Sequence, residues 1–419
     1  MAHTLARPSD ITFRIPRQRV AIMIGTRPEA IKMAPVVHEL ARRDAFFEPI
    51  VISTGQHREM LQQAFAVTGI APDIDLDLMR PGQGLADFSS LSMAAVSGVI
   101  DTVQPDVLLV QGDTTTVAAS ALVGYYRGVK VGHVEAGLRS HDLRSPFPEE
   151  GNRRVAGTLA DFHFAPTEGA RRNLLREGVR RGRIFVTGNT VVDALRAVRL
   201  DTPFESAELA AVPFEGRRVL LATSHRRENQ GTGLASICRA LRTLAEGHDV
   251  EIVFPVHLNP AVRAVVHAEL SGVPHVHLVD PLSYPDLLKV MSRSTLILSD
   301  SGGIQEEAPS FGRPILILRD TTERPEVVEA GAGVLVGTDE RVIVAEATRL
   351  LSDPVAYAAR ASAPNPFGDG CAAQRIADVL AADALSLPLP DVSWSASPPE
   401  SRPVRRLRQV MRRLPRRAA

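Results

Sequence analysis

Acidic side chains stand directly after several apolar stretches of this sequence, where a ligand could reach them. Asp113 and Glu135 each follow a strand-like run, and Glu149 stands at the start of a helix-like segment. Carboxylates can accept and return protons, so three of them at such positions favour proton transfer to and from a substrate. Each one alone also has a structural explanation, as a helix cap or as a complement to the helix dipole.

Basic side chains occupy equivalent positions later in the chain. His225 follows an apolar run directly and precedes Arg226 and Arg227, and His257 follows the next run. Histidine and arginine together can neutralise a diphosphate. A lone histidine is more often structural, but two at equivalent strand ends favour a site.

A glycine-containing turn, Ser301-Gly302-Gly303, lies between the apolar run 296–298 and a helix-like segment. Glycines let the backbone approach a ligand closely, and the start of a helix presents free N–H groups to an anion. The turn therefore predicts a phosphate site. Glu306 and Glu307 follow at once and could accept hydrogen bonds from sugar hydroxyls. Together these features favour a nucleotide-sugar ligand.

The first apolar run ends in a turn of its own, Gly25-Thr26-Arg27-Pro28-Glu29. Arg27 can make a forked contact with phosphate, and Lys32 in the same predicted helix could reach the same ligand. No metal-ligand cluster is recognised among the motifs above, and the first turn lacks the GxGxxG dinucleotide fingerprint. We therefore predict a site without metal, nicotinamide or other cofactor.

Short apolar strands alternate with helical stretches along most of the chain, which predicts α/β domains with parallel sheets covered on both faces. The sequence indicates two series of six strands, and hence two doubly wound, Rossmann-like domains that face a cleft. Ligands of such sheets bind beyond the carboxyl ends of the strands. The predicted strands are 20–24, 50–53, 107–110, 129–134, 162–164 and 184–186, followed by 219–222, 251–254, 277–279, 296–298, 315–318 and 334–336.

Domain limits follow from the same pattern. We predict a disordered leader (1–18), a first domain with the strand-end acids (19–188 plus 368–385), a second domain with the nucleotide-sugar turn (189–367), and a Pro/Ser linker with an arginine-rich tail (386–419). Eight arginines and no acid lie between 402 and 417. Such a tail is either a solvated segment or a basic amphipathic helix with a weak attraction to an anionic membrane surface.

Composition excludes some classes of protein. The formal net charge of the 419 residues is zero, which gives no indication of a nucleic-acid partner. Cys238 and Cys371 are too few and too far apart for a disulfide framework or a zinc site, and they fit a reducing cytoplasm. No apolar run is long enough to span a membrane, and residues 1–17 lack the apolar core of a signal peptide.

Taken together, the motifs resemble those of the non-hydrolysing UDP-N-acetylglucosamine 2-epimerases of bacteria. The resemblance covers about residues 19–385 and keeps its order along the chain. The matching stretches are Gly25-Thr26-Arg27-Pro28-Glu29, Thr54-Gly55-Gln56-His57-Arg58-Glu59-Met60-Leu61, Gly112-Asp113-Thr114-Thr115, Glu135-Ala136-Gly137-Leu138-Arg139, Pro148-Glu149-Glu150, His225-Arg226-Arg227-Glu228, Ser301-Gly302-Gly303 and Asp320-Thr321-Thr322-Glu323-Arg324-Pro325-Glu326.

The resemblance implies a GT-B architecture, interconversion of UDP-GlcNAc and UDP-ManNAc for surface polysaccharide, and a homodimer. It also implies that the last helix, 372–385, crosses back to the first domain. The implied catalytic residues are Asp113, Glu135, Glu149 and His225. The implied UDP-binding residues are Arg27, Lys32, Ser301, Gly302, Gly303, Glu307 and Arg324. A second UDP-GlcNAc, bound as an activator, would contact Gln56, Gln83, Arg226 and His257.

The chemistry of the sugar sets what such a site must do. C2–H is not next to a carbonyl, so its direct removal is too costly. Departure of UDP from C1 makes C2–H acidic, which implies elimination to a 2-acetamidoglucal and return of UDP with a proton on the other face. Other readings are a hydrolysing epimerase, an epimerase of a modified UDP-sugar, a GT-B glycosyltransferase and a nucleotide-sugar-binding regulator. The base and the acid among the three carboxylates are not assigned.

Overall fold

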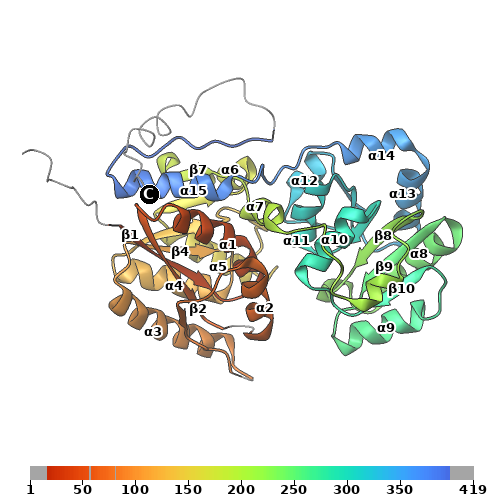
Figure 1. The fold of residues 1–419 in the computed structure, drawn as a ribbon, viewed down its shortest axis with the longest axis horizontal. Coiled ribbons are helices and arrows are strands. Elements are labelled where there is room, and N and C mark those ends of the chain that lie inside the picture. The colour runs from red at the N-terminus through yellow and green to blue at the C-terminus, as the bar shows by residue number, and fades with distance from the viewer. Residues whose placement is uncertain (1–16, 56–57, 81, 397–419) are drawn as a thin grey trace, which may run out of the picture.

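Two parallel β-sheets, each covered by helices, form the body of the molecule (Figure 1). The structure is a computed structural model, and it describes residues 17–55, 58–80 and 82–396. The predicted leader and arginine tail therefore fall almost wholly outside the described residues. Gln18, which we assigned to the leader, already belongs to the first strand.

The first sheet has seven strands in the order β3-β2-β1-β4-β5-β6-β7, and all neighbours are parallel. The strands are β1 (Gln18–Ile24), β2 (Phe47–Ser53), β3 (Ile74–Asp75), β4 (Val107–Gln111), β5 (Lys130–Val134), β6 (Phe162–Ala165) and β7 (Ile184–Val186). The helices of this half are α1 (Arg27–Arg42), α2 (Arg58–Thr68), α3 (Leu85–Val103), α4 (Thr115–Tyr126), α5 (Glu149–Leu159), α6 (Glu168–Arg176) and α7 (Thr190–Ala197).

The second sheet has six parallel strands in the order β10-β9-β8-β11-β12-β13. The strands are β8 (Arg218–Thr223), β9 (Val250–Pro255), β10 (Val276–Val279), β11 (Leu296–Ser299), β12 (Ile315–Ile317) and β13 (Gly333–Leu335). The helices that follow are α8 (Thr232–Gly247), α9 (Pro260–Leu270), α10 (Tyr284–Arg293), α11 (Gly302–Glu307), α12 (Pro325–Glu329), α13 (Glu340–Ser352), α14 (Pro354–Ala361) and α15 (Ala372–Ala384).

The apolar runs become the central strands because both faces of each sheet are covered. All five residues of β4 are buried, and so are the four of β11. A strand covered on both faces needs apolar side chains on both, which is why it reads as a continuous run. The doubly wound fold and all twelve predicted strands are confirmed. The short strand β3 and the helix α3 were not predicted.

The strand order reverses at one point in each sheet, and these two points position the candidate site. The reversal lies between β1 and β4 in the first sheet and between β8 and β11 in the second. At such a point the loops at the carboxyl ends of the strands diverge and leave a crevice. The Arg27 and Asp113 turns follow the first pair of strands, and the His225 and Ser301 turns follow the second pair.

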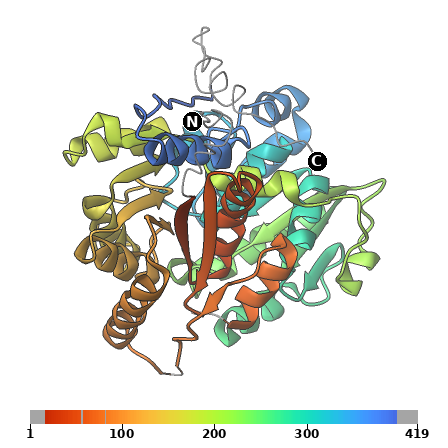
Figure 2. The same ribbon diagram turned by 60° about the vertical axis from the view of Figure 1, so that its left-hand side comes forward.

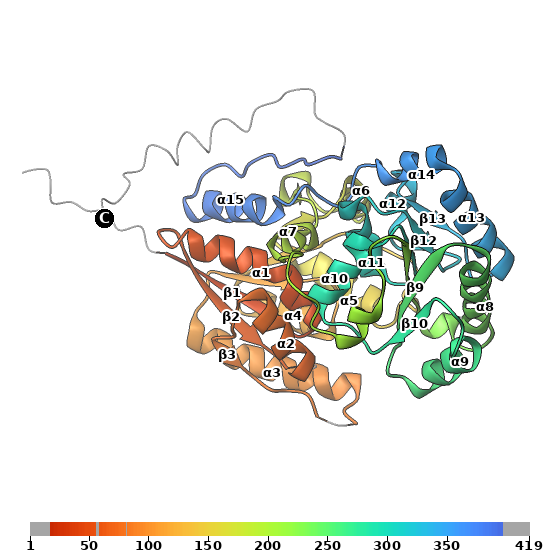
Figure 3. The same ribbon diagram turned by 45° about the vertical axis from the view of Figure 1, so that its right-hand side comes forward.

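The last helix returns to the first sheet, where α15 packs against α1 and α7 (Figure 3). The Asp193 carboxylate on α7 accepts hydrogen bonds from the backbone N–H groups of Ala372 and Ala373, at 3.1 and 2.9 Å. This contact satisfies two free donors at the start of α15. The exact domain limits given above stay a prediction.

The start of the predicted linker and tail, 386–419, contacts the first domain where the structure describes it. The Val186 backbone N–H donates to Val392 O, and Trp394 N–H donates to Val186 O, both at 2.9 Å. Leu389 and Val392 also pack on the apolar core of the first domain. Residues 392–394 thus lie along the edge of β7, which offers free backbone groups that the Pro- and Ser-rich composition does not reveal.

Candidate functional site

Lys32 lies at the centre of a buried group of charges between the two domains. Its ammonium nitrogen is 2.5 Å from Glu135 Oε2 and 2.9 Å from Glu306 Oε2. Lys32 comes from α1 and Glu135 from the end of β5, whereas Glu306 belongs to α11 of the second domain. The three side chains are at most 10% exposed. One cation therefore joins carboxylates from the two domains.

Three side chains bind one carboxylate oxygen of Glu135, which follows β5 directly. Besides Lys32, the Gln111 and Asn189 side-chain amides donate to its Oε2 at 3.2 and 3.1 Å. Its backbone φ of +65° is uncommon for a residue with a side chain, and such strain clusters at functional sites. Burial raises the pKa of Glu135 and Glu306 raises it further, while Lys32 and Arg324 oppose that rise.

Arg324 continues the charged network into the second domain. Its Nε donates to Glu306 Oε1 at 2.7 Å, and its Nη1 lies 3.0 Å from Glu323 Oε1. Glu323 also pairs with Arg226 at 3.0 Å and with Arg319 at 2.5 Å. Burial alone would raise the pKa of Glu306, but Arg324 and Lys32 hold it below its usual range. Charges of alternating sign thus cross the cleft, each with a partner of opposite sign.

Asp113 faces the same crevice from the turn after β4. Its Oδ2 lies 2.7 Å from Arg153 Nη2, and its backbone carbonyl accepts from the Asn152 side chain at 2.9 Å. Arg153 is also bound by Glu150, which is fully buried and accepts from the Ser140 backbone N–H. Glu150 therefore supports Arg153 and the 140 loop, so it has a structural role that its neighbour lacks.

Glu149 is the first residue of α5 and is partly exposed. Its side chain forms no hydrogen bond or ion pair with any residue in the described part of the chain. Of the three predicted acids it is the one whose carboxylate is left open to a ligand.

His225 is oriented by an aspartate that we did not single out. Its Nδ1 lies 3.1 Å from Asp300 Oδ1, which leaves Nε2 directed away from Asp300. Asp300 is fully buried and also accepts from the Arg226 backbone N–H at 3.0 Å and from Ser224 Oγ at 2.9 Å. Burial raises the pKa of Asp300, but the bonds from His225, Arg226 and Ser224 outweigh it and hold the pKa below its usual range.

The Ser301 turn begins α11, as its glycines indicated. A Cβ added to Gly302 would stand 2.7 Å from Arg324 Nη1, so only glycine leaves room for the guanidinium. Ser301 is the N-terminal cap residue of α11, and its backbone N–H donates to Ser299 Oγ. The turn is thus packed directly onto the charged network.

Glu307 is buried at the end of α11 and accepts a hydrogen bond from the Tyr284 hydroxyl at 3.1 Å. Burial raises the pKa of Glu307 to about 7, although Tyr284 and the charge of Arg27 oppose the rise. Burial lowers the pKa of the Arg27 guanidinium at the start of α1, and the charge of Glu307 opposes this change. The charges of these two predicted UDP-binding residues, one from each domain, therefore influence each other.

Glu29 stabilises the first turn, Gly25 to Glu29, through hydrogen bonds. Its carboxylate accepts from the backbone N–H groups of Gly25 and Thr26 and from Thr114 Oγ1, the last at 2.6 Å. Burial raises the pKa of Glu29 to about 7. This side chain links the turn after β1 to the turn after β4, and hence Arg27 to Asp113.

The four residues assigned to an activator site do not lie together in the described structure. Arg226 and His257 lie beside His225, and the rings of His225 and His257 stack with centroids 6.0 Å apart. Gln83 bonds within its own turn, where its Oε1 accepts from the Arg80 backbone N–H at 3.1 Å. Gln56 lies outside the described residues.

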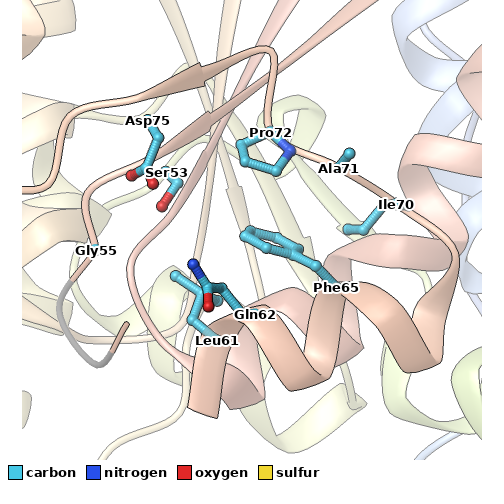
Figure 4. A pocket seen from close by; sticks show the side chains of 9 residues that line it. All are labelled: Ser53, Gly55, Leu61, Gln62, Phe65, Ile70, Ala71, Pro72 and Asp75. Carbon is cyan, nitrogen blue, oxygen red and sulfur yellow. The ribbon is translucent and has the colours of Figure 1, made fainter. Parts of the chain in front are cut away.

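A small pocket lies in the first domain, next to Gly55 (Figure 4). It has a volume of about 210 Å³ and is mainly apolar, with polar side chains at one end. It does not include any of the predicted catalytic residues. Its lining residues are Ser53, Gly55, Leu61, Gln62, Phe65, Ile70, Ala71, Pro72 and Asp75.

Reasoning from the sequence missed several partners in this site. Gln111 adjoins the quoted Gly112-Asp113 turn and Asp300 adjoins Ser301, so position next to a motif could have indicated both. Asn189 and Tyr284 are far from any motif and reach the site only through the fold. No group of three or more metal-binding side chains is found in residues 17–55, 58–80 and 82–396.

A family model described as UDP-N-acetylglucosamine 2-epimerase matches residues 38–381. A UDP-N-acetylglucosamine 2-epimerase of Escherichia coli K12 is 52% identical over 376 residues, which cover 88% of this chain and 100% of that one. The chain belongs to the UDP-N-acetylglucosamine 2-epimerase family. The predicted family resemblance is confirmed.

Solved structures of this family share the fold. A putative UDP-N-acetylglucosamine 2-epimerase from Listeria monocytogenes is 45% identical, with a TM-score of 0.85, and covers 90% of this chain and 99% of its own. A UDP-GlcNAc 2-epimerase from Neisseria meningitidis, bound to UDP-GlcNAc, is 44% identical with a TM-score of 0.81, covering 87% and 99%. The two domains thus have the GT-B architecture of the family. Within the described residues, no helix is long and apolar enough to traverse a bilayer.

Proposed function

We propose that this protein interconverts UDP-GlcNAc and UDP-ManNAc by eliminating UDP from C1 and adding it back there. The proton returns to the other face of C2, which inverts the configuration of that carbon. One observation carries the proposal: the buried group around Lys32 places a strand-end acid of the first domain against the helix that follows the Ser301 turn in the second. An enzyme that detaches a sugar from UDP and rejoins them needs proton transfer and diphosphate binding within one enclosed space.

The two domains have different roles in the elimination step, and the first supplies the groups that transfer protons. As the C1–O bond breaks, its electron pair leaves with UDP, and a carboxylate of the first domain takes the C2 proton. Asp113, Glu135 and Glu149 are the candidates for this base and for the acid that returns a proton on the other face. Two faces of the sugar require two proton-transfer groups or one relay, which explains why three acids are present.

The departing UDP is held by the second domain. The start of α11, Arg324 and the outward Nε2 of His225 are the groups suited to its developing negative charge. Arg27 and Lys32 would contribute from the first domain. Holding UDP in place is necessary, because the same molecule must attack C1 in the return step.

The test is incubation with UDP-GlcNAc in heavy water without added nicotinamide or metal. We expect deuterium at C2 and a mixture of UDP-GlcNAc and UDP-ManNAc. Absence of exchange at C2 would refute the proposed reaction. Free ManNAc as the main product would indicate hydrolysis instead.

Variants then separate catalysis from binding. We expect Asp113→Asn, Glu135→Gln and Glu149→Gln each to lower kcat by roughly 10²–10⁴-fold while UDP still binds in calorimetry. The control Glu168→Gln changes an exposed acid paired with Arg171, and it should leave both quantities unchanged. Unchanged kcat in all three site variants would refute their assignment.

We further propose a homodimer, activation by a second UDP-GlcNAc, and a product used for surface polysaccharide. Arg226 and His257 beside His225 support the activator site, because they could couple a second ligand to the reacting one. Light scattering would test the dimer, and sigmoidal dependence of the reverse reaction on UDP-GlcNAc would test activation.

A further inference from the structure

The chain crosses between the two domains twice, and the two crossings lie against each other. The first, 187–189, leads from β7 into α7, and the second, 362–371, leads from α14 back to α15. They are joined where the Asn189 backbone N–H donates to Phe367 O at 2.6 Å. A rotation of one domain against the other must bend these segments, because hinge motions are absorbed by the few residues that link the moving parts.

The helix α7 packs into the cores of both domains. Val191, Val192 and Leu195 belong to the apolar core of the second domain, and Ala194 belongs to that of the first. Figure 2 shows the yellow-green helix α7 beside the red helix α1, against which it packs. Asn189 is the N-terminal cap residue of α7. Its position is therefore set by both domains.

The Asn189 side chain reaches from the first crossing to the carboxylate of Glu135. Its Nδ2 donates to Glu135 Oε2 at 3.1 Å, and its Oδ1 accepts from the Val191 backbone N–H at 3.0 Å. These two bonds require one orientation of the amide, and the side chain is buried. One residue thus caps α7 and binds an acid of the candidate site.

Glu135 has one bound oxygen and one open oxygen. Lys32, Gln111 and Asn189 all donate to Oε2, whereas no group in the described part of the chain donates a hydrogen bond to Oε1. A substrate proton would therefore be taken up or released at Oε1. The other charged groups that act on this carboxylate come from the second domain and are Glu306 and Arg324.

The second crossing extends these hydrogen bonds to the end of α11. The Phe367 backbone N–H donates to Asn365 Oδ1 at 2.8 Å. The Asn365 amide donates in turn to Ser310 Oγ at 2.6 Å and to Glu306 O at 3.4 Å. Ser310 lies in the short 3-10 helix that directly follows α11. The helix that begins at the predicted phosphate turn is thus connected to Asn189.

We propose that Asn189 is a positioning residue for the epimerisation, which holds Oε2 of Glu135 so that Oε1 faces the sugar. This inference rests on the proposed function. Because Asn189 is itself held by the second crossing, the acid is aligned only when the helix that binds UDP is in place. Groups that transfer protons depend on such alignment, since a small misplacement of the reacting atoms lowers the rate strongly.

The first experiment is Asn189→Ser with UDP-GlcNAc as substrate. Serine keeps a cap for α7 but is too short to reach Glu135. We expect kcat to fall by about 10- to 100-fold, as for loss of one hydrogen bond to a charged group, with KM within about twofold. The acidic limb of the kcat/KM profile should move to higher pH, because a donor to the ionised carboxylate is lost.

The control is Asp339→Ser, which exchanges the exposed cap residue of α13 and should change neither quantity. A lower kcat in Asn189→Ser with an unshifted profile would overturn the proposal, because a purely structural role leaves the pKa of Glu135 as it is.

Asn189→Asp is a second variant that keeps the size of the side chain and its cap acceptor. It replaces the donor by a carboxylate, so the acidic limb should move further to higher pH than in Asn189→Ser. A profile equal to that of wild type would overturn the proposal. Circular dichroism and thermal unfolding establish that each variant is folded.

Gly368→Ala tests whether the second crossing takes part. A Cβ there would stand 3.3 Å from Val192 Cβ and 3.4 Å from Asn189 O, so it must displace the first crossing. We expect a several-fold loss of kcat and a shift of the acidic limb. Gly98→Ala is the control, because a Cβ at Gly98 meets no atom within 4 Å. Wild-type kcat and profile in Gly368→Ala would show that Asn189 does not depend on this crossing.

A double variant separates this inference from the proposed reaction. In Glu135→Gln, the further change Asn189→Ser should cost less than about twofold in kcat, because Asn189 acts through Glu135. Fully additive losses would overturn its role. Failure of the wild-type protein to exchange hydrogen at C2 would instead refute the reaction itself. Exchange in wild type with unshifted profiles in the Asn189 variants would refute only the role of Asn189.

Discussion

The Lys32 ammonium lies 2.9 Å from Glu306 Oε2, and this contact joins α1 of the first domain to α11 of the second. Glu306 is in turn bound by Arg324 at 2.7 Å, so its position depends on both domains. It repels the proton-transfer candidate Glu135 and shares Lys32 with it. Contact between the two domains and the charge state of Glu135 are therefore linked through one carboxylate.

The first prediction concerns that carboxylate. Because Glu306 raises the pKa of Glu135, Glu306→Gln should lower that pKa and move the acidic limb of the kcat/KM profile to lower pH. It should also destabilise the fold by about 1–3 kcal/mol, since ion pairs with two buried cations are lost. Glu346→Gln, which disrupts an exposed pair with Arg349, is the control. An unshifted profile would contradict the link to Glu135.

His225 and Asp300 give the second prediction. Asp300→Asn removes the charge that orients the imidazole, so we expect kcat to fall by about 10²-fold with a smaller change in KM. His225→Asn introduced into Asp300→Asn should add little further loss, because the two residues act as a unit. Ser224→Ala removes another bond to Asp300 and serves as a milder control. Fully additive losses would mean that Asp300 does not act through His225.

The third prediction uses the raised pKa of Glu307. Burial moves it from 4.5 to about 7, so the folded state binds this proton more tightly than the unfolded state does. Stability from this group is fully present below pH 4.5, falls as the pH rises, and is lost above about 7, a change of at most about 3 kcal/mol. Glu307→Gln should therefore be more stable than wild type at pH 8 and equal to it at pH 4.5. Thermal or urea unfolding at the two pH values checks this, and a constant difference would contradict it.

Two buried histidines supply the fourth prediction, with the opposite sign. Burial lowers the pKa of His133 to about 4 and that of His163 to about 3. The unfolded chain then binds protons first, so stability should fall as the pH drops from about 6.5 towards 4. His133 Nε2 lies 2.8 Å from Gly112 O, and Gln can keep a donor there without titrating.

The measurement for this prediction is the slope of unfolding free energy against pH. Between pH 6.5 and 4, we expect His133→Gln to reduce that slope by up to the contribution of one bound proton, about 1.4 kcal/mol per pH unit. The variant of an exposed histidine, His267→Gln, should leave the slope unchanged. A slope that is the same in wild type and His133→Gln would show that His133 is already protonated in the fold.

The sequence by itself determined the elements of the fold and the family. Apolar runs such as 107–110 and 296–298 predict buried strands, because a strand covered on both faces needs apolar side chains on both. Such a run is a local property of the chain. The turns after them carry glycine, arginine and acid residues in an order typical of the family. Asp113, Glu135 and His225 are therefore recognisable as site candidates from their positions in the chain alone.

Only the tertiary structure decided which of these residues meet. Lys32 and Glu306 are 274 positions apart, and Glu135 is held by Asn189, which precedes a helix that no motif marks. Nothing local in the sequence encodes such contacts, because they arise where the loops of two sheets converge at their reversal points. The pairing of Val186 with residues 392–394 is of the same kind. Composition predicted a linker there, and the free edge of β7 binds it through an isolated bridge.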